Sequence, residues 1–147
     1  MSQAKAWTER TRLLLGDERV DELAACHVLV VGLGGVGGYA SELLVRGGIG
    51  RLTIDEVVDV IREESIQPSN INRQLVATHR HIGEPKARVL AERLRDINPE
   101  VQLEVVEDFL KDENMVELLD RHRYDFVVDA IDSLSPKVYL IALARER

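Results

Sequence analysis

Hydrophobic residues along the chain form short runs that alternate with segments where they recur every three or four positions. The runs predict β-strands at 28–31, 51–54, 101–106 and 124–130. The periodic segments predict helices at 1–15, 17–25, 36–46, 86–94, 111–119 and 137–145. Strands that alternate with helices are typical of a parallel sheet covered on both faces. The pattern therefore predicts an α/β fold with a doubly wound, mostly parallel sheet and extra helices before the first strand.

The first strand ends in a glycine-rich turn, G-L-G-G-V-G, which is followed directly by a helical segment. Gly32, Gly34 and Gly37 have the spacing G-x-G-x-x-G. In such turns the first glycine makes the sharp bend, the second lets a phosphate approach the backbone, and the third lets helix and strand pack closely. The helix that follows offers unpaired N–H groups and a partial positive charge. The order strand, turn, helix therefore predicts nucleotide binding.

Acidic residues follow the second strand, where a nucleotide-binding βαβ unit usually carries an acid for the ribose hydroxyls. Asp55 and Glu56 stand there, and Asp59 comes a few positions later. The apolar run 57–61 is an alternative continuation of this strand, and it would shift the position of the acid. The residue patterns do not decide among these acids.

Two further groups of polar residues are candidates for binding phosphate. Asn70, Asn72, Arg73 and Gln74 cluster after the turn at 67–70, where they form either a plain polar loop or a set of hydrogen-bond donors. Lys86 begins a predicted helix just after Pro85. A cation is unfavourable in the first turn of a helix, so Lys86 is expected to bind an anion.

The fourth predicted strand places Phe126, Val127 and Val128 in the interior and ends in D-A-I-D-S. Ligands of doubly wound sheets bind at the carboxyl ends of the strands. Asp132 lies at this edge, where it is either a carboxylate ligand of magnesium or the N-cap of the last helix.

Composition narrows the class of protein. The chain has 147 residues, 45% of them hydrophobic, and a net charge of −7, so no general positive field attracts nucleic acid. Cys26 is the only cysteine, which excludes a disulfide framework and a C-x-x-C zinc site within this sequence. There is no signal-like apolar segment and no long apolar run. We therefore expect a cytoplasmic protein that spans no membrane, with a helical segment at 1–25 and a Rossmann-like nucleotide-binding domain at 26–147.

Four motifs in order carry a more specific resemblance. The chain reads G-L-G-G-V-G, N-I-N-R-Q, G-E-P-K and D-A-I-D-S, and it resembles the ubiquitin-activating-enzyme-like adenylation superfamily, which includes ThiF, MoeB and HesA. The runs R-T-R-L-L-L-G, R-D-I-N-P-E and D-A-I-D-S-L-S-P-K are most similar to the tRNA threonylcarbamoyladenosine dehydratases. In this superfamily ATP activates a carboxylate as an acyl adenylate with loss of pyrophosphate.

The resemblance also implies roles for particular residues. It implies that ATP is surrounded by the glycines Gly32, Gly34, Gly35 and Gly37. It also implies that Asp55 or Glu56 binds the ribose. It assigns the phosphates to Asn70, Arg73, Gln74 and Lys86, and magnesium to Asp132. Arg10 matches an arginine that reaches across a homodimer interface into the partner's ATP site. The carboxylate would belong to threonylcarbamoyladenosine in tRNA, bound largely through regions outside this sequence, and adenylation would lead to its dehydrative cyclisation.

The match has two departures. The stretch from Asp55 to Ser69 is about six residues longer than the superfamily pattern, and this extra length falls between the ribose acid and the asparagine loop. The sequence also resembles only the amino-terminal half of such enzymes, which predicts an unpaired last strand, a tendency to associate and an impaired activity.

Three other functions are weighed against tRNA modification. Sulfur-carrier proteins are the alternative substrate, since ThiF and MoeB adenylate their C-terminal glycine. An NAD-binding oxidoreductase explains the glycines and the acid, but it leaves N-I-N-R-Q and G-E-P-K without a role. A nucleotide fold that serves only for oligomerisation is the remaining alternative.

Overall fold

The structure is a computed structural model that describes residues 6–56, 65–106 and 112–147. Four strands form one sheet: β1 (His27–Val31), β2 (Arg51–Asp55), β3 (Gln102–Val106) and β4 (Phe126–Asp129). The helices are α2 (Glu9–Leu15), α3 (Asp17–Ala25), α4 (Gly37–Gly47), α5 (Lys86–Ile97), α6 (Asp112–Arg121) and α7 (Leu134–Arg145). Two short 3₁₀ turns lie at Pro68–Asn70 and His79–His81. The predicted order of strands and helices is confirmed for the described residues.

All strand pairs are parallel, and the strand order is β3-β2-β1-β4. β1 therefore lies inside the sheet, and its residues Val28 to Val31 are each no more than 1% exposed. Such a strand is a continuous apolar run because both of its faces are covered. The strand order reverses between β2 and β4, on either side of β1, and this is the place where open α/β sheets bind ligands.

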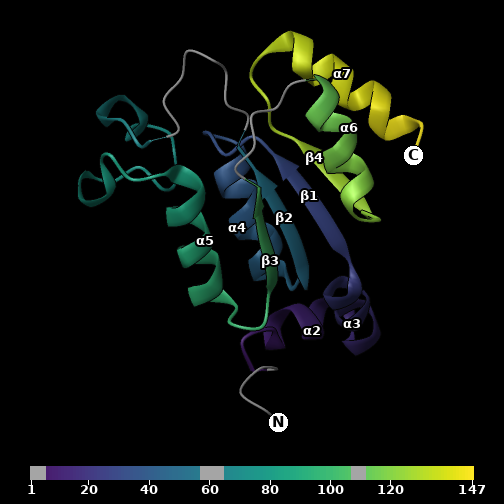
Figure 1. Cartoon of the computed structure of the whole chain (residues 1–147). Helices are drawn as coiled ribbons and strands as arrows, with labels where there is room; N and C mark the ends of the chain where they lie inside the picture. The colour runs from purple at the N-terminus through teal and green to yellow at the C-terminus, as the bar shows by residue number, and fades with distance from the viewer. Residues whose placement is uncertain (1–5, 57–64, 107–111) are drawn as a thin grey trace.

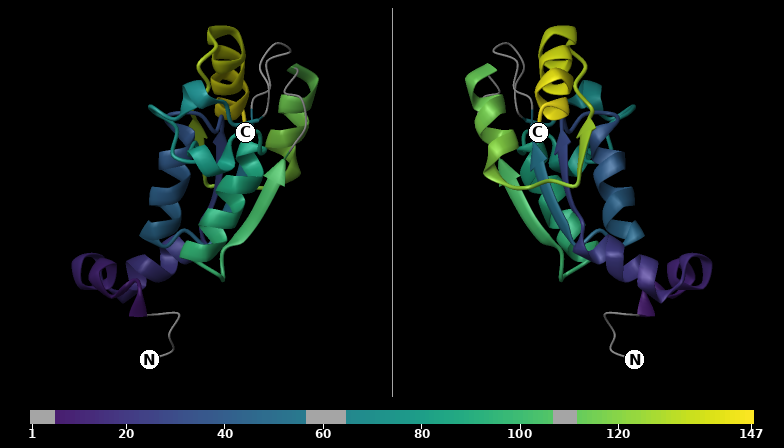
Figure 2. Two further views of the ribbon diagram at one scale, coloured as in Figure 1. Left: turned by 90° about the vertical axis from the view of Figure 1, so that its left-hand side faces the viewer. Right: turned by 90° about the vertical axis from the view of Figure 1, so that its right-hand side faces the viewer.

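The helices form a layer on each face of the sheet (Figure 2). α4 and α5 cover one face, where Val30, Leu52 and Ile54 belong to the core. α6 and α7 cover the other face, around Leu29 and Val31. Successive residues of a strand point to opposite faces, which explains how the run in β1 supplies both cores. The fold is thus Rossmann-like, as the alternating pattern predicts.

α2 and α3 lie at the end of the sheet where the strands begin (Figure 1). α3 leads through Cys26 directly into β1, and Gly16, with φ +86°, separates the two helices. The carboxyl ends of the strands are at the opposite end of the sheet. The N-terminal helices are therefore remote from the glycine turn of the same chain.

Phe126 corrects one prediction, because it is 63% exposed rather than buried, and Val127 and Val128 are only partly buried. β4 pairs with β1 on one side, and no described strand pairs with its other side. An apolar run therefore predicted a strand correctly but did not show that this strand lies at an edge. The helix after β4 also differs: it begins at Leu134, and Ser133 rather than Asp132 is its N-cap.

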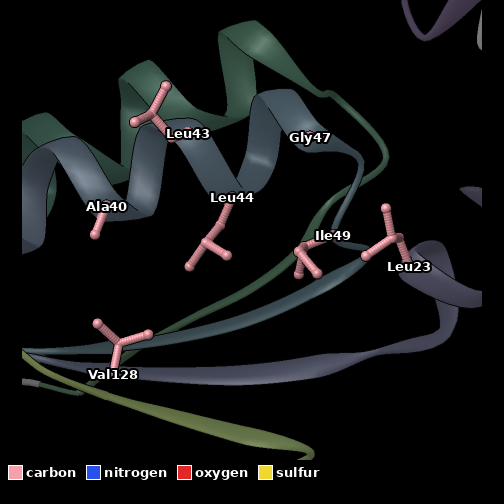
Figure 3. Close-up of a pocket in the computed structure, with 7 residues that line it drawn as sticks. All are labelled: Leu23, Ala40, Leu43, Leu44, Gly47, Ile49 and Val128. Atoms are coloured by element: carbon pink, nitrogen blue, oxygen red, sulfur yellow. The ribbon is translucent and has the colours of Figure 1, made fainter. Parts of the chain in front are cut away.

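An apolar pocket of about 390 Å³ lies against α4, close to this edge (Figure 3). Ala40 and Leu44 point from α4 toward Val128 of β4, and Leu23 and Ile49 close the far end. Among the described residues, no polar side chain lines it. A pocket without polar groups has no means of orienting a nucleotide, so this pocket is distinct from the glycine turn.

Candidate functional site

The glycine turn joins β1 to α4 in the way that the spacing predicts. Gly32 has φ +94°, and a Cβ there would lie 2.6 Å from the carbonyl oxygen of Ala130, so neither the conformation nor the space allows a side chain. At Gly37 a Cβ would lie 1.6 Å from the carbonyl oxygen of Gly32. The first glycine therefore makes the bend and the last permits the contact between helix and strand. The turn itself lies between the ends of β2 and β4.

The loop around Arg73 lies against this turn. A Cβ on Gly35 would come within 3.5 Å of the Arg73 carbonyl oxygen and 3.6 Å of its Cγ, and the amide nitrogen of Gln74 lies 3.8 Å from the corresponding position on Gly34. The structure thus brings two polar residues, 36 or more positions away in the printed sequence, onto the glycines.

Arg73 keeps its charge available to an anion. Its Nη1 donates to the Ser69 carbonyl oxygen at 2.8 Å and to Asn72 Oδ1 at 3.0 Å, and both acceptors are neutral. The side chain is exposed. A guanidinium that is oriented by neutral groups retains its full attraction for a phosphate, which it can bind with two parallel hydrogen bonds.

Gln74 is only 8% exposed, and among the described residues its Oε1 has no hydrogen-bond partner. Buried side-chain amides almost always have partners, so a polar group on a ligand would remove this deficit. Asn70 has a different role, because its Oδ1 accepts a hydrogen bond from the Gln67 backbone N–H at 2.9 Å. Asn70 is buried and holds the shape of the loop.

The two acids predicted for the ribose have different surroundings. Asp55 ends β2 and is 1% exposed, and its carbonyl oxygen accepts a hydrogen bond from the Gly32 N–H at 2.8 Å. Glu56 is the next residue, and its Oε1 lies 3.1 Å from Lys86 Nζ. Both members of this ion pair are mostly buried, with exposed fractions of 13% and 12%. Asp59, the third candidate, lies outside the described residues, as does most of the longer stretch.

Lys86 is the first residue of α5, so it stands at the positive end of that helix, as the sequence predicts. The anion that it contacts is the Glu56 carboxylate. Burial of a charge is costly unless it is paired, so this ion pair explains how Lys86 is tolerated there. It also places a lysine ammonium next to the carboxyl end of β2.

Asp132 and Arg10 lie in very different places. Asp132 is exposed and follows β4 at the carboxyl ends of the strands, close in sequence to the Ala130 that contacts Gly32. Arg10 is exposed on α2, at the opposite end of the sheet (Figure 1). Within one chain Arg10 does not join the other predicted residues.

Sequence reasoning missed one ion pair at this edge. Lys137 Nζ lies 2.7 Å from Asp129 Oδ2, at the end of β4. Both residues stand in the run D-A-I-D-S-L-S-P-K. The sequence carried a signal for this pair, because a lysine at the start of a predicted helix is expected to bind an anion, as Lys86 is.

The parallel sheet, the glycine turn between two strand ends and the surrounding cations are typical of nucleotide-binding α/β proteins. A family model described as the ThiF family matches residues 8–147. The chain belongs to the ThiF family. The resemblance read from the four motifs is therefore confirmed.

The relatives include both kinds of enzyme that the sequence suggests, namely dehydratases and enzymes that adenylate sulfur-carrier proteins. The chain is 42% identical, over 143 residues, to the tRNA threonylcarbamoyladenosine dehydratase of Escherichia coli strain K12, covering 95% of this chain and 51% of that relative. It is 39% identical, over 127 residues, to the sulfur carrier protein adenylyltransferase of Thermus thermophilus, covering 86% of this chain and 44% of that protein. The chain thus spans about half the length of these relatives.

The fold also matches a solved structure. The E. coli tRNA threonylcarbamoyladenosine dehydratase in complex with ATP superimposes with a TM-score of 0.89 at 39% identity, covering 97% of this chain and 56% of that one.

Among the helices of the described residues, none combines the length and apolar character that crossing a bilayer requires.

Proposed function

We propose that this chain forms the ATP-binding part of an enzyme that adenylates a carboxylate. The observation that carries the proposal is the position of Arg73, an exposed cation whose partners among the described residues are neutral, directly over the glycine turn. An NAD-binding oxidoreductase would need the turn and an acid, but it would not need this arginine. The ATP complex of the E. coli relative supports the same choice of nucleotide.

The residues at the carboxyl ends of the strands fit ATP. Gly32, Gly34, Gly35 and Gly37 leave the backbone of the turn open to phosphates, and Arg73 and Lys86 supply positive charge. Gln74 Oε1 is an acceptor without a partner among the described residues, so it offers a contact to a donor such as a ribose hydroxyl or the adenine amino group, and Asn70 shapes its loop. Of the two ribose candidates we favour Glu56, because Asp55 is almost completely enclosed.

Magnesium fits the site only together with the nucleotide. Within the described ranges, no three acidic, histidine or cysteine side chains gather into a set that would hold a metal alone. Mg²⁺ is typically bound by one or two carboxylates together with substrate phosphates and water. Asp132, exposed at this edge, is the carboxylate that we assign to it.

Bound ATP supplies the adenylyl group: a carboxylate oxygen forms a bond to the α-phosphorus, and the bond from that phosphorus to the departing pyrophosphate breaks. The residues of this chain contribute fixed positive charge where negative charge develops, and such preorganised charge is usually the largest part of catalysis. Within one chain we assign this role to Arg73 and Lys86. Arg10 would have to come from a second copy, so we propose a homodimer.

We favour tRNA threonylcarbamoyladenosine as the source of the carboxylate, because dehydratases are among the most similar curated relatives. A sulfur-carrier protein is the second candidate, and the T. thermophilus relative favours it. With a net charge of −7, the chain is poorly suited to bind tRNA by itself. Release of pyrophosphate on addition of tRNA, but not of carrier protein, would support the first candidate, and the reverse would support the second.

Calorimetric titration tests the nucleotide. We expect the chain to bind ATP with magnesium more tightly than NAD, and Arg73→Ala to weaken ATP binding by at least about tenfold. A charge-assisted hydrogen bond contributes roughly 1.5–3 kcal/mol, and 1.4 kcal/mol is a factor of about ten. Arg80→Ala is the matched control, since Arg80 is an exposed arginine that is not among the nearest neighbours of the turn glycines. Tighter binding of NAD, or equal ATP affinity in the Arg73 and Arg80 variants, would contradict the proposal.

A further inference from the structure

Both strands that flank β1 end next to a carboxylate that binds a lysine. On one side Glu56, just after β2, contacts Lys86 in the first turn of α5. On the other side Asp129, the last residue of β4, contacts Lys137 in the first turn of α7. The glycine turn at the end of β1 therefore has a lysine–carboxylate pair on each side. The superfamily resemblance assigns a role to Lys86 but none to Lys137.

The Asp129 carboxylate is held at both oxygens. Oδ2 accepts from Lys137 at 2.7 Å, and Oδ1 accepts from the backbone N–H of Ile131 at 3.0 Å. Ala130 lies between Asp129 and Ile131 in the sequence, and its carbonyl oxygen packs against Gly32. This short segment thus fixes the Lys137 ammonium relative to the glycine turn.

Lys137 can still donate hydrogen bonds outward. An ammonium has three N–H donors, and Asp129 uses one of them. The Lys137 side chain is 33% exposed, whereas Asp129 is 18% exposed, so the lysine is the more accessible member of the pair. A lysine near the positive end of a helix is unfavourable in the absence of an anion, and Asp129 supplies one. The N–H donors that Asp129 does not use remain able to bind a second anion.

We propose that Lys137 is a further phosphate-binding residue of this site and that Asp129 positions it. This inference rests on the proposed function and extends it by naming a contact on the β4 side of the glycine turn. The oxyanion recognised is a phosphate of the nucleotide. Lys86 and Lys137 then approach that phosphate chain from opposite sides of β1.

The test compares Lys137→Met with Arg145→Met, which removes an exposed cation from the far end of the same helix. Titrations use ATP with magnesium, AMP and adenosine. We expect Lys137→Met to weaken binding of ATP about tenfold, the loss of one charge-assisted hydrogen bond. Adenosine, which lacks phosphate, should bind equally well to both variants. Lys137→Arg should retain most of the affinity for ATP.

Thermal unfolding separates this role from a structural one. If Lys137 only ties α7 to β4, Lys137→Met lowers the melting temperature but leaves the preference for ATP over adenosine unchanged, and the inference is overturned. Lys137→Gln, which keeps a hydrogen-bond donor for Asp129, replaces Lys137→Met should that variant unfold. Unchanged ATP affinity in the Lys137 variants together with a loss in Arg73→Ala would overturn this inference alone. Failure of the wild-type chain to bind ATP would overturn the proposed function and this inference together.

Discussion

Two clusters of polar side chains differ in what their polar groups do in this fold: in one we expect them to bind a ligand, and in the other they bind one another. One cluster lies at the carboxyl ends of the strands, around Arg73, Lys86 and Lys137. The other lies on the α6 side of the sheet, toward the amino ends, and we call it the His27 cluster. Its members are His27, Thr53, Glu104, His122 and Tyr124.

Hydrogen bonds in the His27 cluster connect His27, Thr53, Glu104 and His122. His27 Nε2 lies 2.9 Å from Thr53 Oγ1, which donates to Glu104 at 3.4 Å. Glu104 also lies 2.6 Å from His122 Nε2, and the Tyr124 ring packs edge-on against His27 with ring centroids 4.7 Å apart. His27 and Thr53 are buried, whereas Glu104 and His122 lie at the surface end of the network. Hydrogen bonds to buried polar groups help to define a unique packing. We expect this cluster to stabilise the chain, whereas we propose that the carboxyl-end cluster keeps donors for a ligand.

The largest effect is expected from Gly37→Ala. A Cβ would lie 1.6 Å from the Gly32 carbonyl oxygen, so α4 would have to move away from β1. We expect a loss of about 3 kcal/mol or more in the free energy of unfolding, together with loss of ATP binding. This variant is an exception to the contrast between the two clusters, because in our account the glycine turn contributes both to stability and to ATP binding.

Urea unfolding followed by circular dichroism measures the change. Gly47→Ala is the matched control on the same helix, since no atom lies within 4 Å of its added Cβ and its φ is not positive. We expect that control to be neutral or stabilising by up to about 1 kcal/mol. Equal stability of the Gly37 and Gly47 variants would refute this account of the turn.

A smaller effect is expected from the His27 cluster, and it depends on pH. Burial lowers the pKa of His27, with help from the positive charges of His122 and Arg51, while Glu104 and Asp125 oppose the change. The unfolded chain then binds a proton near pH 6.5 more readily than the folded chain. Stability should therefore fall as the pH drops below about 6.5 toward the lowered pKa of the folded state.

His27→Gln tests whether the His27 cluster affects stability without affecting ATP binding. Unfolding midpoints in urea at pH 7.5 and 5.5 should differ less in this variant than in wild type, and ATP affinity at pH 7.5 should be unchanged. Glu42 does not interfere in this range, because ion pairing with Arg93 lowers its pKa and its contribution is lost only at more acidic pH. An unchanged pH dependence, or an ATP affinity that falls with the substitution, would contradict the separation of the two clusters.

Local signals explain why most of the fold could be predicted. The buried run before Gly32 and the glycine at each bend specify β1 and the ends of α2 and α4. The error at Phe126 has a physical cause, since an apolar run does not report whether a strand has neighbours on both sides. α7 begins three residues earlier than predicted because a proline is tolerated in the first turn of a helix.

The site was predictable in outline but not in its pairings. Motif order identifies Arg73 and Lys86, but only the structure shows that Glu56 contacts Lys86. The members of the His27 cluster come from four separate parts of the sequence, so no local spacing indicates their contact. Side-chain contacts between distant segments depend on strand register, and that register is fixed only when the sheet assembles.

Chemical shift mapping of the amide groups during titration with magnesium ATP tests the central claim most directly. It reports where the nucleotide binds along the whole chain. The account predicts shifts at Gly32 to Gly37, at Arg73 and Gln74, and around Ala130, with little change at His27 or in the apolar pocket beside α4. Shifts confined to the pocket or the His27 cluster, or none at saturating ATP, would contradict it.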